Sequence, residues 1–177
     1  MILREIIVEK VRVSSFFLTL VSMLFLATNI YAADPLVVKH IDKSWDSKTV
    51  PKKGVCLRRG GDGFSPKIQI SKIPENTAVL KLMFTDMNFG KEGGHGGIET
   101  SVNGKTEIVV PSFRDTLPKG FKGIKKHHCK PCRSIGGNDY YNGPCSPQRK
   151  HTYKVFIYAV SKNGKTLSKG NLTLGKY

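Results

Sequence analysis

The sequence predicts an all-β domain with long loops, arranged as a sandwich. Three observations indicate this fold class. Beyond residue 33 the apolar residues fall into short alternating segments, Pro and Gly separate those segments, and no segment has the periodicity of a long amphipathic helix. Strands that follow one another without intervening helices favour two packed layers of sheet.

Several short segments are predicted to be strands. They are 67–71, 77–85, 106–110, 152–160 and a closing pair that ends in the Asn-Leu-Thr-Leu stretch at 171–174. In the second segment one face carries only apolar residues, namely Ala78, Leu80, Leu82 and Phe84. The segment 152–160 is apolar on both faces apart from Lys154, which predicts a central strand buried on both sides. Asn-Gly pairs at 103–104 and 163–164 are turn dipeptides.

Residues 1–33 have the pattern of a secretory signal peptide. Charged residues near the start precede the uncharged run "VSSFFLTLVSMLFLATNIYAA", which ends in the small residues Ala32 and Ala33. An uncleaved membrane anchor is the alternative, because the run is close to the length that spans a bilayer. Either interpretation places residues 34–177 outside the cytoplasm, as a periplasmic or secreted domain. Their number is typical of one domain with its own core.

The charge balance is strongly basic. The chain has 29 Lys and Arg against 13 Asp and Glu, a net charge of +16, and residues 34–177 keep +15 of it. Such a field attracts anionic lipid surfaces, polyanions or phosphate ligands, and the alternative is a role in solubility alone. Apart from "KGFKGIKKHHCK" the basic residues are spread along the chain, so we expect no specific nucleic-acid partner.

Four cysteines in an exported domain indicate disulfides, and four allow three pairings. We expect the pairs Cys56–Cys145 and Cys129–Cys132. A zinc site built from His127, His128, Cys129 and Cys132 is chemically possible. Adjacent histidines point apart on an extended chain, however, so we expect no metal. A redox-active pair usually opens a helix, whereas these two cysteines lie in a Lys-, Pro- and Gly-containing loop.

Three separated stretches resemble one known family. They are "GVCLRRGGDGFSPKIQISKIPENTAVLKLMFTD", "YYNGPCSPQRKHTYKVFIYAV" and the terminal "LTLGKY". In this order they are similar to the bacterial phosphatidylethanolamine-binding proteins, also called Raf-kinase-inhibitor-like proteins. The second stretch resembles that family's Tyr-x-Gly-Pro-Cys-Pro-Pro loop followed by His-x-Tyr. Together the stretches cover most of residues 54–177.

The resemblance implies a two-sheet antiparallel sandwich with a small surface cavity for an anion such as phosphate or a phospholipid headgroup. It implies no cofactor. The residues that match the family's ligand-binding positions are Asp86, Asn88, His95, Tyr141, Gly143, Pro144, His151 and Tyr153.

Three departures from the family pattern stand out. "TDMNFG" replaces the family's Asp-Pro-Asp-Ala-Pro signature, and the loss of both prolines leaves that loop less constrained. Gly96 follows His95 where the family usually has Trp. Only "VSKNGKTLSKGN" separates the strand ending in Tyr-Ala from the closing stretch, so a C-terminal helix common in the family is expected to be shortened or absent.

We therefore expect an exported, non-catalytic protein that binds an anionic small molecule or a phospholipid headgroup. A basic module that contacts a host or envelope protein, or an anionic membrane surface, is one alternative. A hydrolase of phosphate esters is another, in which Asp86, His95 and His151 would supply acid–base chemistry. No serine or cysteine stands in a recognised nucleophile motif, and Ser146 lacks the glycines of a nucleophile elbow.

Overall fold

The computed structural model describes residues 34–89, 92–125, 140–148 and 150–177. All of them belong to one compact unit, Ala33–Tyr177. The predicted signal peptide and the Cys129–Cys132 pair, with the two histidines before it, lie outside the described residues. Within the described part of the chain, no helix has the length and apolar character needed to cross a bilayer.

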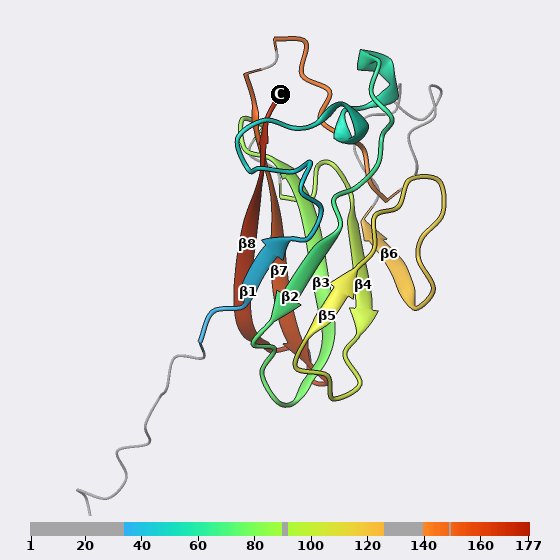
Figure 1. The fold of residues 1–177 in the computed structure, drawn as a ribbon. Helices are drawn as coiled ribbons and strands as arrows, with labels where there is room; N and C mark the ends of the chain where they lie inside the picture. Colours follow the sequence, from blue (N-terminus) through green and yellow to red (C-terminus); the bar gives the residue numbers. More distant parts are fainter. Residues whose placement is uncertain (1–33, 90–91, 126–139, 149) are drawn as a thin grey trace, which may run out of the picture. The chain divides into compact units, whose positions relative to one another are not determined.

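The described residues form eight strands in two antiparallel sheets (Figure 1). The smaller sheet has the order β1-β2-β5, with β1 at Val37–His40, β2 at Ile68–Ser71 and β5 at Ile108–Val110. The larger has the order β6-β4-β3-β7-β8, with β6 at Phe121–Lys125, β4 at Gly97–Ser101, β3 at Thr77–Asp86, β7 at Thr152–Ser161 and β8 at Thr166–Lys176. Two short 3₁₀ helices, η1 (Lys52–Gly54) and η2 (Leu57–Arg59), interrupt the connection from β1 to β2.

The core lies between the two sheets. Alternate residues of β2, β3 and β7 point inward and are fully buried, among them Ile68, Ile70, Leu80, Leu82, Phe84, Val155 and Ile157. This two-residue period is the one that the sequence shows in these segments. Burying such side chains is the main favourable contribution to folding, at roughly 25 cal/mol for each Å² removed from water.

The structure confirms the predicted fold class. The predicted segments correspond to β2, β3, β5, β7 and β8, and β7 joins β8 directly through residues 162–165, so the shortened C-terminal region contains no helix. Three strands were not predicted. β1 has only four residues, while β4 and β6 contain glycine, so their sequences carry little alternating pattern.

The prediction that β7 is buried on both faces was wrong. Val155, Ile157 and Ala159 are inaccessible to solvent, whereas Phe156 and Tyr158 on the other face are half-buried. β7 is an interior strand of the larger sheet, but the smaller sheet packs on only one of its faces. The outer face instead carries polar interactions, as where the Tyr158 hydroxyl donates to Glu92 at 2.7 Å.

A disulfide joins Cys56 to Cys145, as predicted, across a sequence separation of 89 residues. It connects the start of η2 to the loop that precedes β7. The amide of Cys56 also donates to the carbonyl of Pro144 at 3.0 Å, so the same contact is fixed by a covalent bond and a hydrogen bond. Closing a long loop removes many conformations from the unfolded chain, which stabilises the folded state.

His40, at the end of β1, is half-buried against Trp45. Its Nε2 donates to the carbonyl of Thr173 at 3.0 Å, and its buried Nδ1 has no hydrogen-bond partner among the described residues. Burial lowers the pKa of His40 below its ordinary value, and the bond to Thr173 offsets this only in part. The neutral imidazole is therefore the form that the fold favours.

Replacing Cys56 and Cys145 together by alanine should lower the free energy of unfolding by about 4 kcal/mol, because the long loop is no longer closed. Urea unfolding of residues 33–177, followed by circular dichroism, measures this loss. The Cys129→Ala/Cys132→Ala variant is the matched control, because a bond between these neighbours would close only a very short loop. Equal losses in the two variants would contradict the explanation.

Acidification should destabilise the fold through His40. Because its pKa is lower in the folded state, the unfolded chain binds the proton first as the pH falls below about 6.5. This contribution to stability is complete above that pH and is lost as the pH falls toward the folded pKa. His40→Gln keeps a donor for Thr173 but does not titrate, so it should flatten the pH dependence of the urea midpoint. An unchanged slope in the variant would refute this origin.

Candidate functional site

The pairing of β3 with β7 brings the candidate residues together. Asp86 is the last residue of β3 and lies opposite Tyr153 in the antiparallel register. His151 lies just before β7 and two residues before Tyr153, so the two side chains point to the same side. The turn after β3 and the loop before β7 therefore meet at one end of the strands of the larger sheet.

The Asp86 carboxylate is the centre of this group. The residue is only 3% exposed, and its Oδ2 accepts a hydrogen bond from Nδ1 of His151 at 2.7 Å. Its Oδ1 accepts the amide of Asn88 at 2.9 Å, and Nε2 of His95 lies 4.0 Å from Oδ2. A carboxylate can only accept, so the proton of His151 is on Nδ1, and its Nε2 is the ring nitrogen left for a ligand.

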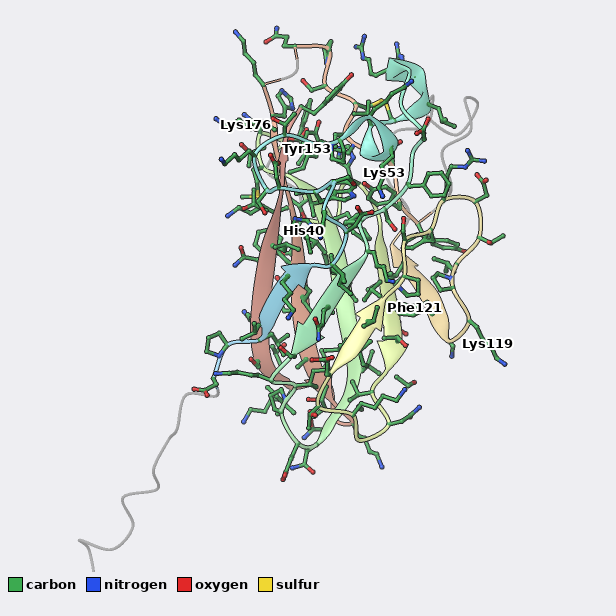
Figure 2. All side chains as sticks on the ribbon, in the orientation of Figure 1. His40, Lys53, Lys119, Phe121, Tyr153 and Lys176 are labelled. Carbon is green, nitrogen blue, oxygen red and sulfur yellow. A yellow bond between two sulfur atoms is a disulfide. The ribbon has the colours of Figure 1, made fainter. Side chains whose placement is uncertain are left out.

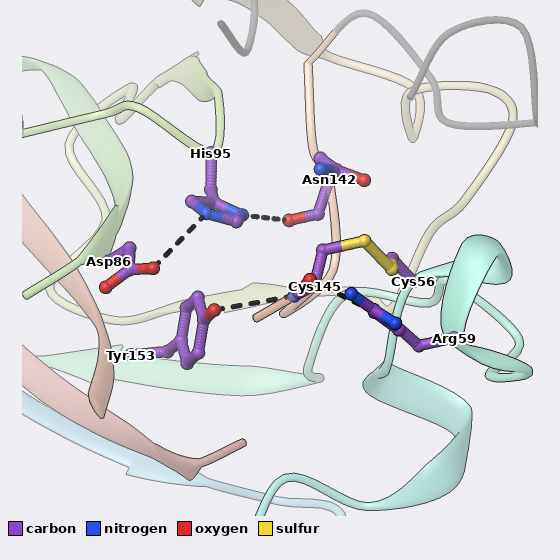
Figure 3. Close-up of a disulfide and its surroundings, with 7 residues drawn as sticks. All are labelled: Cys56, Arg59, Asp86, His95, Asn142, Cys145 and Tyr153. Carbon is purple, nitrogen blue, oxygen red and sulfur yellow. Dashed lines mark hydrogen bonds and ion pairs between the residues drawn. A yellow bond between two sulfur atoms is a disulfide. The ribbon is translucent and has the colours of Figure 1, made fainter. Parts of the chain in front are cut away.

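His95 is held in a fixed orientation by the loop before β7. Its Nδ1 donates to the carbonyl of Asn142 at 2.8 Å, and its own carbonyl accepts the Asn142 amide at 2.9 Å (Figure 3). Burial lowers the pKa of His95 below the ordinary value, although the bond to Asn142 and the charge of Asp86 oppose this. In the neutral ring Nε2 is an acceptor, and it faces the Asp86 carboxylate across a gap too wide for a direct hydrogen bond.

Tyr153 lies between the two histidines. Its ring is edge-on to His95 with centroids 5.1 Å apart, and it is stacked against His151 at 6.4 Å. Burial raises the pKa of the Tyr153 phenol and the charge of Asp86 adds to this effect, so the hydroxyl stays protonated and remains a donor. The phenol oxygen accepts the amide of Cys145 at 3.4 Å, as Figure 3 shows.

Glycines let the loop before β7 approach the strands closely. Gly96 has a φ of +108°, and a Cβ there would lie 2.0 Å from the carbonyl oxygen of Tyr140. Gly143 packs against the carbonyl of Gly54, which a Cβ would approach to 2.2 Å. Gly96, which departs from the family pattern, is therefore required by the position of Tyr140. With the disulfide at Cys145, these contacts hold the loop against the rest of the fold.

The other predicted site residues have supporting positions. Tyr141 is buried in the core, edge-on to Phe84 at 4.7 Å, and burial raises the pKa of its phenol. Asn88 ties the turn to β7, because its Oδ1 accepts the amide of Thr152 at 3.0 Å. Pro144 is buried and contributes its carbonyl to the amide of Cys56.

Sequence reasoning missed one residue that shapes the site. Asn142 orients His95 entirely through its backbone carbonyl and amide, and such contacts leave no signal in the residue type. The neighbouring Gly-Pro dipeptide indicated only that the loop is rigid. Among the described residues no group of three or more His, Cys, Asp or Glu side chains is arranged to hold a metal ion.

The arrangement offers both acceptors and donors to a ligand. Oδ2 of Asp86 and Nε2 of His95 accept, and the Tyr153 hydroxyl, which also hydrogen-bonds to the Asp86 side chain, is the donor beside them. Nε2 of His151 is the remaining ring nitrogen that can meet a ligand, because Nδ1 is used by Asp86. These donors and acceptors are complementary to a ligand that has an anionic group and, a few bonds away, a hydrogen-bond donor.

Comparison with known proteins agrees with this fold and geometry. Residues 43–176 match the family model described as phosphatidylethanolamine-binding protein. No curated protein matches the sequence. Several solved structures share the fold, among them the two that follow. A phosphatidylethanolamine-binding protein homolog of Chlamydia trachomatis is 20% identical, with a TM-score of 0.55 over 81% of this chain and 97% of that one.

The second structure is YbcL of Escherichia coli, described as a new member of the mammalian family. It is 16% identical to this chain, with a TM-score of 0.57 over 81% of this chain and 98% of that one. At these identities the structures show a common fold, and the family match spans most of the chain. The protein therefore belongs to the phosphatidylethanolamine-binding protein family.

Proposed function

We propose that the protein is an exported, non-catalytic binding protein whose pocket takes a phosphate-bearing ligand, with a phospholipid headgroup of the phosphoethanolamine type as the best fit. The observation that carries the proposal is the Asp86–His151 contact beside a protonated Tyr153 and a neutral His95. The basic charge of the chain favours an anionic ligand in the same way.

Phosphoethanolamine suits both halves of the pocket. Its phosphate group can accept from the Tyr153 hydroxyl and lie against Nε2 of His151, and hydrogen bonds to a charged group are among the stronger ones in proteins. Its ammonium group can donate to Asp86 and to Nε2 of His95, which face each other 4.0 Å apart. Inorganic phosphate can contact Tyr153 and His151 in the same way, but it has no ammonium group to donate to Asp86 and His95. We therefore expect inorganic phosphate to bind more weakly.

The same residues support binding better than catalysis. An Asp–His pair is a known arrangement for activating a hydroxyl, which makes phosphate-ester hydrolysis the second candidate. The hydroxyl beside this pair is the Tyr153 phenol, and its raised pKa makes it a poor nucleophile near neutral pH. Ser146 is buried, and its Oγ accepts the amide of Gln148 at 3.4 Å.

Calorimetric titration of residues 33–177 with phosphoethanolamine and with phosphate tests the proposal. We expect saturable binding, tighter for phosphoethanolamine. His151→Phe should weaken it by about tenfold or more, because the ring nitrogens that hydrogen-bond are lost while an aromatic ring is kept. His40→Gln is the matched control, because it changes another half-buried histidine that is not part of the site, and its affinity should stay unchanged.

Three results would overturn the proposal. The first is equal binding by the wild type and His151→Phe. The second is binding that disappears at modest ionic strength, which would point instead to the dispersed basic residues, because a buried contact is screened less than an exposed one. The third is turnover of p-nitrophenyl phosphate by the wild type that is abolished in His151→Phe, which would make the protein a hydrolase.

A further inference from the structure

The turn that follows β3 presents two apolar side chains to solvent. Phe89 is 76% exposed, more than any other large apolar residue of the described chain, and Met87 is 42% exposed. They alternate with Asp86 and Asn88, whose side chains are used inside the site and its supporting turn. A single exposed apolar residue is ordinary, but a phenylalanine and a methionine in one turn form a small apolar tip.

This turn is held by four hydrogen bonds. The amide of Met87 donates to the carbonyl of Thr152 at 2.8 Å, and the amide of Phe89 to the carbonyl of Asp86 at 3.3 Å. The amide of Asn88 donates to the Asp86 carboxylate, and its side chain accepts the amide of Thr152. The backbone therefore fixes Phe89 in an exposed position, rather than leaving it free to fold back on the core.

The apolar tip is in direct contact with the candidate site. The Phe89 ring lies edge-on to His151, with centroids 5.5 Å apart. Asp86, the first residue of the turn, is the carboxylate that orients His151. Any surface that receives Phe89 would therefore lie next to the pocket.

Basic side chains surround the same end of the fold. Lys150 directly precedes His151, and Lys176 lies opposite Thr152 in the sheet register. Figure 2 shows Lys176 and Tyr153 at the same end of the strands. Lys176 also lines an open cleft of about 480 Å³ together with Lys52 and Arg59. All four cations are exposed, and none forms an ion pair with an acidic residue of the described chain.

We propose that this end of the protein docks on the surface of a bilayer that contains anionic phospholipid, with Phe89 and Met87 entering the interface. Aromatic and apolar side chains partition into the interface between headgroups and acyl chains, while Lys and Arg are attracted to the negative surface. The pocket would then receive its headgroup directly from the bilayer. That last step rests on the function proposed above, whereas the docking itself does not depend on it.

The two features together favour a lipid surface over a soluble anion. A soluble phosphate ligand could bind through the candidate site and the cations, and an exposed phenylalanine would not strengthen that binding. Binding to a bilayer surface depends on both the exposed apolar residues and the cations, because apolar insertion and electrostatic attraction add to the binding strength. The charge of the chain is complementary to an anionic surface in sign.

Vesicle binding with a probe at position 89 tests the proposal. Phe89→Trp places a fluorophore in the tip, and the only natural tryptophan, Trp45, is 3% exposed and already has a buried environment. Both the full chain and residues 33–177 are mixed with vesicles of phosphatidylcholine, alone or with phosphatidylglycerol. We expect a blue shift of the emission only with the anionic vesicles. Val109→Trp, at an exposed apolar position on β5, should show no shift.

Cosedimentation with the same anionic vesicles supplies the affinity. Phe89→Ser should weaken binding by about tenfold or more, because the apolar contact is lost. Val109→Ser, the matched control, should leave it unchanged.

The outcomes separate docking from headgroup binding. Vesicle binding that needs Phe89 supports the docking proposal even if soluble phosphoethanolamine does not bind, in which case only the proposed ligand is wrong. Equal vesicle binding by Phe89→Ser and the wild type would overturn the docking proposal, as would the absence of a shift at position 89. If the wild type and Phe89→Ser bind the vesicles equally and salt removes the binding of both, the basic residues act without insertion of Phe89.

Discussion

The antiparallel register of β3 against β7 is the constraint on which the candidate site depends. It places Asp86 opposite Tyr153 and brings His151 within 2.7 Å of the carboxylate. The strands are held in this register by the inward residues of both, which would move to the opposite face if the pairing slipped by one residue. The hydrophobic core therefore determines the relative positions of the polar groups at its edge.

The second constraint is the loop before β7, which closes the site from the other side. Its position results from a covalent bond at Cys145 and from close backbone contacts at Gly96 and Gly143. The turn after β3, which lacks the two prolines of the family pattern, is ordered by Asn88, whose backbone amide and side chain bond to Asp86 and Thr152. The side chains of the site are therefore already ordered in the folded protein, so binding a ligand would cost little further conformational entropy.

The sequence predicted the features that depend on local pattern. Alternation predicted β2, β3 and β7, because one face of each is buried in the core. It could not predict β4 or β6, whose positions are set by pairing with β3 and with each other rather than by alternating apolar residues.

The candidate site was predictable to a similar extent. Asp86 and His151 were identified from their resemblance to a family motif, and the structure brings them into contact. Three features were not predictable. The bond from Asn142 to His95 is made by the backbone, the need for glycine at position 96 comes from the distant Tyr140, and the exposure of Phe89 depends on hydrogen bonds of its turn to β7. Each is a long-range contact that leaves no periodic signal in the sequence.

The central claim is that Asp86 fixes the proton of His151 on Nδ1 and leaves Nε2 for the ligand. Nitrogen–proton NMR correlation of the imidazole rings tests it most directly, with His40 as an internal reference. We expect His151 to carry its proton on Nδ1 and its Nε2 signal to shift on addition of phosphoethanolamine, while His40 stays unchanged. A His151 ring protonated only on Nε2, or equal shifts at both histidines, would contradict the account.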